Sequence, residues 1–369
     1  MGENVFLIGY DSNAHLQSET GRRRHVPRIE FYKREGEASL LDPKEGFTEK
    51  TMAFEVRRDP LTGHLSRILP FRRKLPENEI SPDILDRSRN GCPFCRDQMA
   101  TATPQLTREI APEGRLERGE ACLFPNAFPY ARHNWVVVLS KSHFLSADQF
   151  TVDILKDGFS LAQEGIRRLE KKDATFRYPS INWNYLPQAG AGLYHPHLQV
   201  VVEDAPTTSH RRVLEALGAY RERTGSFFWE DFLEEERGRN ERYVGRRGNV
   251  HFLTAFSPAG SWGEAQVLFS GRPTVGDVTI DDWTHFSEGL AAILRYLRSK
   301  ALDSFNLAIF SGGEDQARGW VYARLCPRMP FPPWGTSDVN YFEKLHGEVF
   351  CLIPPEKMCE ELRPFFVTK

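Results

Sequence analysis

The sequence predicts an α+β fold made of two similar halves, each an antiparallel sheet with helices packed on it. Three observations lead to this prediction. Each half runs in the same order, from a strand to an amphipathic helix and then to two strands joined by a glycine-containing loop. Moving the first half forward by 127 residues places His195 on Tyr322, which indicates an internal duplication. The chain of 369 residues is also long enough for two domains.

The composition indicates a protein that works in solution. The net charge of -2 favours neither a nucleic-acid nor a membrane partner. No apolar run approaches the roughly 20 residues that cross a bilayer, and the N-terminus lacks the pattern of a signal peptide. Six cysteines, of which two are closely spaced, do not make a disulfide framework. We therefore expect a cytoplasmic protein with reduced thiols.

Four segments follow from composition and periodicity. Residues 1–50 are polar and predicted to be an irregular N-terminal extension. Residues 51–204 form the first half, and residues 205–245 are strongly charged and are interpreted as a connecting helix and linker. Residues 246–369 form the second half, in which the polar motif of the first half is degenerate.

The first half contains one clear helix among its strands. The Val-rich stretch at 134–143 predicts a strand, and Thr151 is a suitable N-cap for the helix that follows. Two further strands are expected between 179 and 204. The helix is indicated by apolar residues at helical spacing, namely Ile154, Leu155, Phe159, Ala162, Ile166 and Leu169.

The second half repeats this order. A strand is predicted at 264–271, and a strand, a glycine-containing loop and a second strand at 305–330. Between them, a helix is indicated by Trp283, Phe286, Leu290, Ile293, Leu294 and Leu297.

The stretch HPHLQ carries the most informative pattern. In a strand, alternate residues face the same side, so His195, His197 and Gln199 would form a row opposite a core-facing side. Solvent-facing histidines on a half-exposed sheet would give the same pattern. The preceding AGAG loop, with Gly190 and Gly192, favours a functional site over solvent-facing histidines, because such a loop lets backbone N–H groups approach an anion closely.

A second cluster is typical of a metal site. Cys92 and Cys95 have the spacing at which two thiolates hold one Zn²⁺, and His143 and His195 are the best candidates for the remaining two ligands. A redox pair is an alternative, although no thioredoxin-like pattern surrounds these cysteines. A metal-free pair of buried cysteines is the other alternative.

The motif HPHxQ at 195–199 resembles that of the galactose-1-phosphate uridylyltransferase branch of the histidine-triad (HIT) superfamily. Three other stretches agree with the family in order: RRDPLTGHLSRILPFRRKLP at 57–76, CPFC at 92–95 and FPNAFP at 124–129. The resemblance covers about residues 54 to 365. It implies two HIT-like halves and transfer of a nucleoside monophosphate by a ping-pong reaction through a nucleotidyl-histidine.

The resemblance also implies roles for single residues. His197 would be the nucleophile, because a neutral imidazole is a good nucleophile and a good leaving group from phosphorus. Gln199 would donate a hydrogen bond to the phosphoryl oxygens, and Arg72 would bind phosphate. Asn126 and Asn184 would contact the nucleotide. The zinc ligands would be Cys92, Cys95, His143 and His195, and this zinc would be structural, because four protein ligands leave no open position.

The sequence departs from the family at several positions. The family's acidic residue in the F-x-N-D-F block is Ala127, and its second basic residue near Arg72 falls on Leu75. Tyr322 and Arg324 stand where iron-binding members have histidines, so no iron is expected. The first two changes touch the recognition of nucleotide and sugar.

Three functions are consistent with these residues. The leading one is a uridylyltransferase-like enzyme of galactose and carbohydrate metabolism, which moves a nucleoside monophosphate between a nucleotide sugar and a hexose 1-phosphate. The second is an adenylyltransferase or nucleotide phosphorylase with the same His197 intermediate, acting on another nucleotide. The third is a zinc-stabilised binding protein without turnover.

The acceptor side is less clearly marked. The second half is expected to complete the sheet and part of the acceptor pocket, for its own chain or for a neighbouring subunit of a homodimer. The segment 337–348 is dense in polar and aromatic residues, as an acceptor site would be, but a helix capped by Ser337 or Asp338 would give the same pattern.

Overall fold

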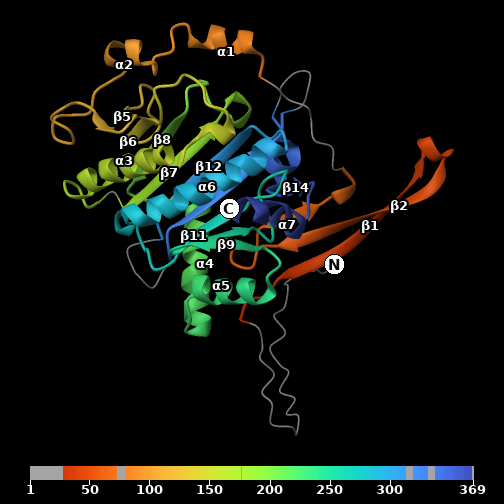
Figure 1. Cartoon of the computed structure of the whole chain (residues 1–369). Coiled ribbons are helices and arrows are strands. Elements are labelled where there is room, and N and C mark those ends of the chain that lie inside the picture. The colour runs from red at the N-terminus through yellow and green to blue at the C-terminus, as the bar shows by residue number, and fades with distance from the viewer. Residues whose placement is uncertain (1–27, 73–79, 176, 313–318, 331–336, 368–369) are drawn as a thin grey trace, which may run out of the picture.

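The computed structural model describes residues 28–72, 80–175, 177–312, 319–330 and 337–367, without the side chain of Arg72. Among these residues, ten strands form one large sheet, which runs through the centre of the molecule (Figure 1). All its pairings are antiparallel. In spatial order the strands are β4 (Leu116–Arg118), β5 (Ala121–Pro125), β6 (His133–Val138), β8 (His197–Glu203), β7 (Tyr178–Tyr185), β12 (Ser304–Phe310), β13 (Tyr322–Arg328), β11 (Ala265–Phe269), β10 (Val250–Thr254) and β9 (Tyr243–Arg247).

The two halves meet at the middle of this sheet, where β7 pairs with β12. Outward from this seam the first half runs β7, β8, β6, β5, β4, and the second half runs β12, β13, β11, β10, β9. Corresponding strands therefore occupy corresponding places, and this order supports the predicted duplication. The α+β class with antiparallel sheets is confirmed.

Two long helices, α3 (Val152–Glu170) and α6 (Ile280–Ser299), lie across one face of the sheet (Figure 1). Their apolar sides and the inward residues of both halves form one continuous core. The predicted cap is present, since the Thr151 hydroxyl accepts from the backbone N–H of Ile154. Side chains such as Trp183 and Phe286 are fully buried in this core, and each contributes roughly 1.5–3 kcal/mol by leaving water.

The opposite face is covered by a different set of helices. In place of one connecting helix, residues 205–245 form α4 (Thr208–Thr224) and α5 (Phe228–Arg239), which pack against the second half through a smaller apolar cluster. Two short helices, α1 (Pro82–Arg89) and α2 (Arg96–Ala102), precede β4 in the chain. The Cys92–Cys95 segment lies between α1 and α2.

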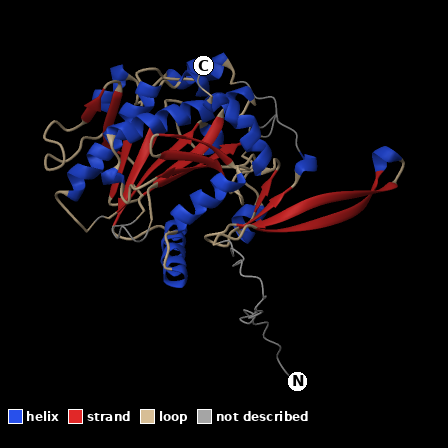
Figure 2. Ribbon diagram, turned by 60° about the horizontal axis from the view of Figure 1, so that its bottom comes forward, coloured by secondary structure: helices blue, strands red, loops and turns tan. Residues whose placement is uncertain are grey.

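The N-terminal extension contains regular structure, contrary to the prediction. β1 (Tyr32–Asp42) and β2 (Thr48–Arg58) pair along their whole length as a hairpin that projects from the body (Figures 1 and 2). The predicted boundary at residue 50 falls inside β2. Residues 1–27 lie outside the described part. β2 carries Met52, Phe54 and Val56 on one face, where they are half-buried or buried, whereas β1 is exposed along most of its length, so the alternation that marks a half-buried strand is present in one strand only.

The remaining elements are a second, smaller sheet, the last helix and several short helical turns. β2 pairs antiparallel with β3 (Leu65–Ile68), which pairs in parallel with β14 (Val349–Cys351), so that β1, β2, β3 and β14 form a second sheet. The last helix, α7 (Pro355–Phe366), adds to the main core. Short helical turns are η1 (Pro43–Glu45), η2 (Pro70–Arg72), η3 (Ala147–Gln149), η4 (Pro187–Ala189), η5 (Val275–Asp277) and η6 (Phe342–His346). None of the helices described is both long enough and apolar enough to span a membrane.

Candidate functional site

The HPHLQ strand is only partly as predicted. Leu198, Val200 and Val202 face the core and are fully buried, while His197 and Gln199 share the opposite face. However, β8 begins at His197, so His195 lies just before the strand and is not part of the row. Proline at 196 has no N–H to donate to a sheet ladder, which fits a strand that starts one residue later.

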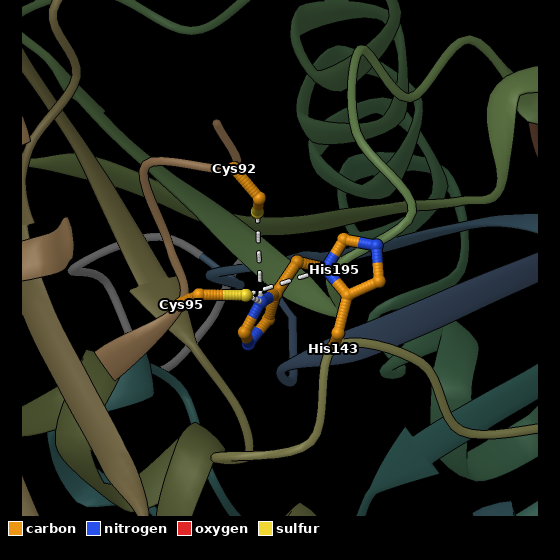
Figure 3. Close-up of side chains that lie close together, drawn as sticks. All are labelled: Cys92, Cys95, His143 and His195. Atoms are coloured by element: carbon orange, nitrogen blue, oxygen red, sulfur yellow. Dashed lines mark hydrogen bonds between the residues drawn. The ribbon is translucent and has the colours of Figure 1, made fainter. Parts of the chain in front are cut away.

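Cys92, Cys95, His143 and His195 come together in one cluster (Figure 3). One ligand atom from each residue lies within 4.8 Å of all the others. His143 does not end the Val-rich strand as predicted, because β6 stops at Val138 and His143 lies in the turn that follows. The cluster thus joins three separate segments of the first half.

The second ring nitrogen of each histidine in the cluster is also hydrogen-bonded. Nε2 of His195 lies 2.8 Å from the backbone carbonyl oxygen of Ser140. Since a carbonyl can only accept, Nε2 carries the proton and Nδ1 keeps its lone pair on the side of the cysteines. Nε2 of His143 lies 2.9 Å from the Ser88 hydroxyl on α1. Such outer hydrogen bonds orient metal-binding histidines.

The spacing of the cluster fits a tetrahedral zinc ion. With bonds of about 2.3 Å to sulfur and about 2.05 Å to nitrogen, a tetrahedral site separates S and N ligand atoms by about 3.6 Å. Here the Cys95 sulfur lies 3.5 Å from His143 Nδ1 and 3.7 Å from His195 Nδ1. The Cys92 sulfur lies 3.8 Å from His195 Nδ1. The donor set and its geometry could therefore hold a metal ion.

His197 is held in one tautomer next to this cluster. Its Nδ1 lies 2.8 Å from the backbone carbonyl oxygen of His195, so Nδ1 is protonated and Nε2 keeps a lone pair. Phe94, between the two cysteines, contacts the ring edge-on with 5.1 Å between centroids. Burial lowers the pKa of His197, although its hydrogen bond to His195 opposes this shift. The lowered pKa favours the neutral imidazole, the form that a nucleophile requires.

A cavity of about 350 Å³ opens beside His197 and Gln199. Its walls are mostly apolar, and three of them are the aromatic rings of Phe94, Phe124 and Phe128. Gly192 of the AGAG loop also lines the cavity, and a side chain built there would meet open space. A flat ring system in contact with such rings is stabilised by stacking and burial. The three phenylalanines had no periodic signal in the sequence, because Phe94 and Phe128 lie in loops and Phe124 alone lies on a strand, β5.

Of the residues predicted to bind phosphate or nucleotide, some line the cavity beside His197 and others do not. Asn126 lines the cavity, but its amide is occupied by Asn134 at 2.9 Å and by the backbone N–H of Phe128 at 3.0 Å. It therefore organises the loop after β5. Arg72 ends η2, and its side chain lies outside the described part, as does Leu75.

Asn184 lies at the seam between the halves. Its side-chain oxygen accepts from Asn306 Nδ2 at 2.7 Å, and Asn306 in turn accepts from Arg328 at 2.9 Å. Gly190 follows η4 in a left-handed conformation with φ of 90°, which favours glycine at this turn. The backbone N–H of Gly190 is used within the turn by Pro187.

The corresponding place in the second half has different chemistry. Tyr322 is buried against α4 and α5, and Arg324 forms an ion pair with the buried Glu264 at 2.9 Å. In segment 337–348, neither Ser337 nor Asp338 caps a helix. Both accept hydrogen bonds from Arg328 instead, with 2.6 Å between its Nε and Asp338.

No family model matches the chain. A protein of Archaeoglobus fulgidus, described only as uncharacterised, is 30% identical over 316 residues, which are 84% of this chain and 91% of that protein. The chain belongs to one family with this archaeal protein. This relationship covers both halves of the sheet and carries no assigned activity.

The chain is also similar in structure to solved proteins whose activity is described. An ADP-glucose phosphorylase of Arabidopsis thaliana with bound ADP-glucose is 17% identical, with a TM-score of 0.65 over 84% of this chain and 98% of that chain. A uridylyltransferase is 18% identical, with a TM-score of 0.62 over 85% of this chain and 99% of that chain. The chain therefore has the fold of galactose-1-phosphate uridylyltransferase-like proteins, as the HPHxQ resemblance implied.

Proposed function

We propose that the protein is a nucleotidyltransferase that moves a nucleoside monophosphate through a covalent intermediate on His197. The observation that carries this proposal is the neutral, single-tautomer imidazole of His197 beside an apolar cavity. Nε2 would attack the α-phosphorus of a nucleotide sugar, forming a P–N bond as the sugar phosphate leaves. A phosphorylated acceptor would then attack the same phosphorus and release His197.

The polar groups around His197 support transfer over hydrolysis. Gln199 can donate a hydrogen bond to the phosphoryl oxygens but has no proton to give to a leaving group. A phosphorylated leaving group needs no such proton at neutral pH. We therefore propose a hexose 1-phosphate as the acceptor in the leading case.

A second candidate is an adenylyltransferase or nucleotide phosphorylase. The observation that favours it is the cavity wall, where Ala127 replaces an acidic residue and Asn126 is engaged within its own loop. Without a carboxylate to pair with one particular base or ribose, stacking on phenylalanine rings would dominate recognition. A purine offers the larger stacking surface.

We further propose that the Cys92, Cys95, His143 and His195 cluster binds one structural zinc. When bound, this ion would tie the segment between α1 and α2 to the sheet and would supply no open coordination position. The chain's own residues would orient the histidines. Ser140 and Ser88 orient the two histidines, and the backbone of His195 holds the proton on Nδ1 of His197.

The protein is also proposed to form a homodimer through its hairpin. The β1–β2 hairpin projects from the body (Figure 2) and exposes Leu40, Leu41 and Phe47. Beyond the residues that pair with β3, the hairpin has only two strands, and a two-stranded hairpin is marginally stable in water, so a second copy of the chain is the proposed cover. Sedimentation should give a dimer that Leu41→Asp weakens, and a monomer at all concentrations would contradict this.

The reaction is tested by incubating the protein with UDP-glucose or ADP-glucose labelled in the α-phosphate. Acid-labile label should appear on the wild-type protein with at least one donor and should be absent from His197→Ala. The donor that labels the protein distinguishes the two candidates. If neither donor nor a dinucleoside polyphosphate labels it, a zinc-stabilised binding protein without turnover becomes the better explanation.

A further inference from the structure

A tyrosine outside the HPHLQ motif makes the closest contact to the Gln199 side chain. Tyr130 lies in the loop between β5 and β6, and its hydroxyl donates to Oε1 of Gln199 at 2.6 Å. Tyr130 is not among the residues that line the cavity, and 68% of its surface is exposed. The sequence analysis had no reason to single it out.

The loop that carries Tyr130 is tied at its start by hydrogen bonds. Asn126 joins its start to Asn134 on β6 through both a backbone bond and a side-chain bond, each of 2.9 Å. The same asparagine accepts from the backbone of Phe128. On the other side, the backbone oxygen of Gln199 accepts from Asn182 at 3.3 Å. The start of the loop that carries Tyr130 and the strand that carries Gln199 are therefore each tied by hydrogen bonds.

The direction of this hydrogen bond decides what Gln199 presents to the cavity. A carboxamide can rotate by half a turn with little change in shape, which exchanges its oxygen and its NH₂ group. Only the NH₂ group can donate to a phosphoryl oxygen, whereas the carbonyl oxygen would repel it. With Oε1 held by Tyr130, the NH₂ group is left free. Within the described residues, Nε2 of Gln199 has no hydrogen-bond partner.

We propose that Tyr130 is a positioning residue that holds the Gln199 amide with its NH₂ group toward the transferred phosphoryl group. This inference rests on the proposed function of His197 and deepens it. Partial burial raises the pKa of the Tyr130 hydroxyl, so it keeps its proton and its donor role at neutral pH. Tyr130 acts through Gln199 and does not itself touch the reacting atoms.

A double-mutant cycle tests this role. Tyr130→Phe should slow single-turnover formation of the nucleotidyl-enzyme by roughly five- to twentyfold, as expected for one hydrogen bond, with less than twofold change in KM for the donor. In a Gln199→Ala background the same substitution should cost less than twofold. Tyr32→Phe, an identical change on the exposed hairpin, is the matched control. A full effect in the Gln199→Ala background, or an effect on KM alone, would show that Tyr130 contacts the substrate directly.

A second measurement is independent of turnover. The side-chain amide of Gln199, assigned by its loss in Gln199→Ala, should be rigid in the wild type by ¹⁵N relaxation, with an order parameter above about 0.8. In Tyr130→Phe it should fall below about 0.6. An equally rigid amide in both proteins would overturn the inference even if no nucleotide donor is found. Failure of the wild type to be labelled, with a rigid amide that Tyr130→Phe loosens, would instead overturn the proposed reaction alone.

Discussion

Nδ1 of His197 lies 2.8 Å from the backbone carbonyl oxygen of His195, the residue that points into the cysteine–histidine cluster. The two histidines are separated by one proline, so the cluster and the candidate nucleophile share one short piece of backbone. Any displacement of His195 would move the carbonyl that holds the His197 proton. The residue that belongs to the cluster therefore also supplies the hydrogen-bond acceptor for Nδ1 of the neighbouring imidazole.

His197→Ala is expected to abolish formation of the nucleotidyl-enzyme, because no other imidazole lines the cavity within the described part of the chain. His197→Gly should recover part of the activity with added imidazole, which fits the space left by the side chain. The measurement is single-turnover labelling. His285→Ala, on α6 across the sheet, is the control and should behave as the wild type. A normal rate of labelling in His197→Ala would refute the assignment.

Metal analysis of unchelated protein should find one zinc per chain, with Zn–S bonds near 2.3 Å and Zn–N bonds near 2.0–2.1 Å by X-ray absorption. Cys92→Ala and His195→Ala should each lose the zinc and should have a lower Tm than the wild type. Both changes should be seen in the purified variants without any measurement of the reaction. Cys359→Ala, a buried cysteine on α7, should keep the metal. Equal zinc content in Cys92→Ala and the wild type would rule the site out. Stoichiometric iron bound by the second half would contradict the prediction that Tyr322 and Arg324, in place of histidines, leave this half without an iron site.

Gln199→Ala should slow nucleotidyl transfer by roughly ten- to a thousandfold, since one hydrogen bond to developing charge is worth about 1.5–4 kcal/mol. The effect should fall on the rate of the chemical step and leave zinc content unchanged. Single-turnover rates and metal analysis of the same preparation check both statements. A rate within twofold of the wild type would mean that Gln199 does not contact the phosphoryl group.

Stability should depend on pH through Glu356. Burial alone would raise the pKa of this carboxyl, but hydrogen bonds and charge from Arg57 and Arg242 outweigh burial and lower the pKa to about 2. A lowered folded-state pKa stabilises the fold above the unfolded value, near pH 4.5, and this contribution is lost as the pH falls toward 2. Glu356→Gln should cost roughly 2 kcal/mol at pH 7 and less at pH 3.

Urea unfolding of both proteins at the two pH values measures this difference. Glu360→Gln, on the exposed side of α7, is the matched control and should change stability by less than about 0.5 kcal/mol. An equal cost of Glu356→Gln at both pH values would show that folding does not lower the pKa of Glu356.

Gly289 on α6 should not tolerate alanine. A Cβ atom there would lie 2.1 Å from the Phe252 ring, so either the helix or the ring must move. We expect Gly289→Ala to lower the free energy of unfolding by about 1–3 kcal/mol. Gly218→Ala on α4, where a Cβ meets nothing within 4 Å, should instead stabilise by roughly 0.5–1 kcal/mol. Urea unfolding of both variants decides, and equal effects would show that α6 does not approach β10 this closely.

The sequence by itself determined the parts of the protein that depend on local pattern. Apolar residues at helical spacing and the Thr151 cap predicted α3, and the same spacing predicted α6, because burying one face of a helix requires that periodicity. Alternation at Leu198, Val200 and Val202 predicted the core side of β8. The spacing of Cys92 and Cys95 indicated a metal site, and its two histidine partners were predicted from their places at two strands and from the family resemblance.

Only the tertiary structure decided the features that depend on residues far apart in the chain. The exposed strand β1 shows no regular alternation of apolar and polar residues, so residue 50 was predicted as a boundary although it lies inside β2. The join of the halves through β7 and β12, the neutral tautomer of His197, and the contact of Tyr130 with Gln199 each need two segments to meet in space. Hydrogen-bond direction and cavity shape depend on contacts between distant segments, and the periodicity of the sequence does not predict them.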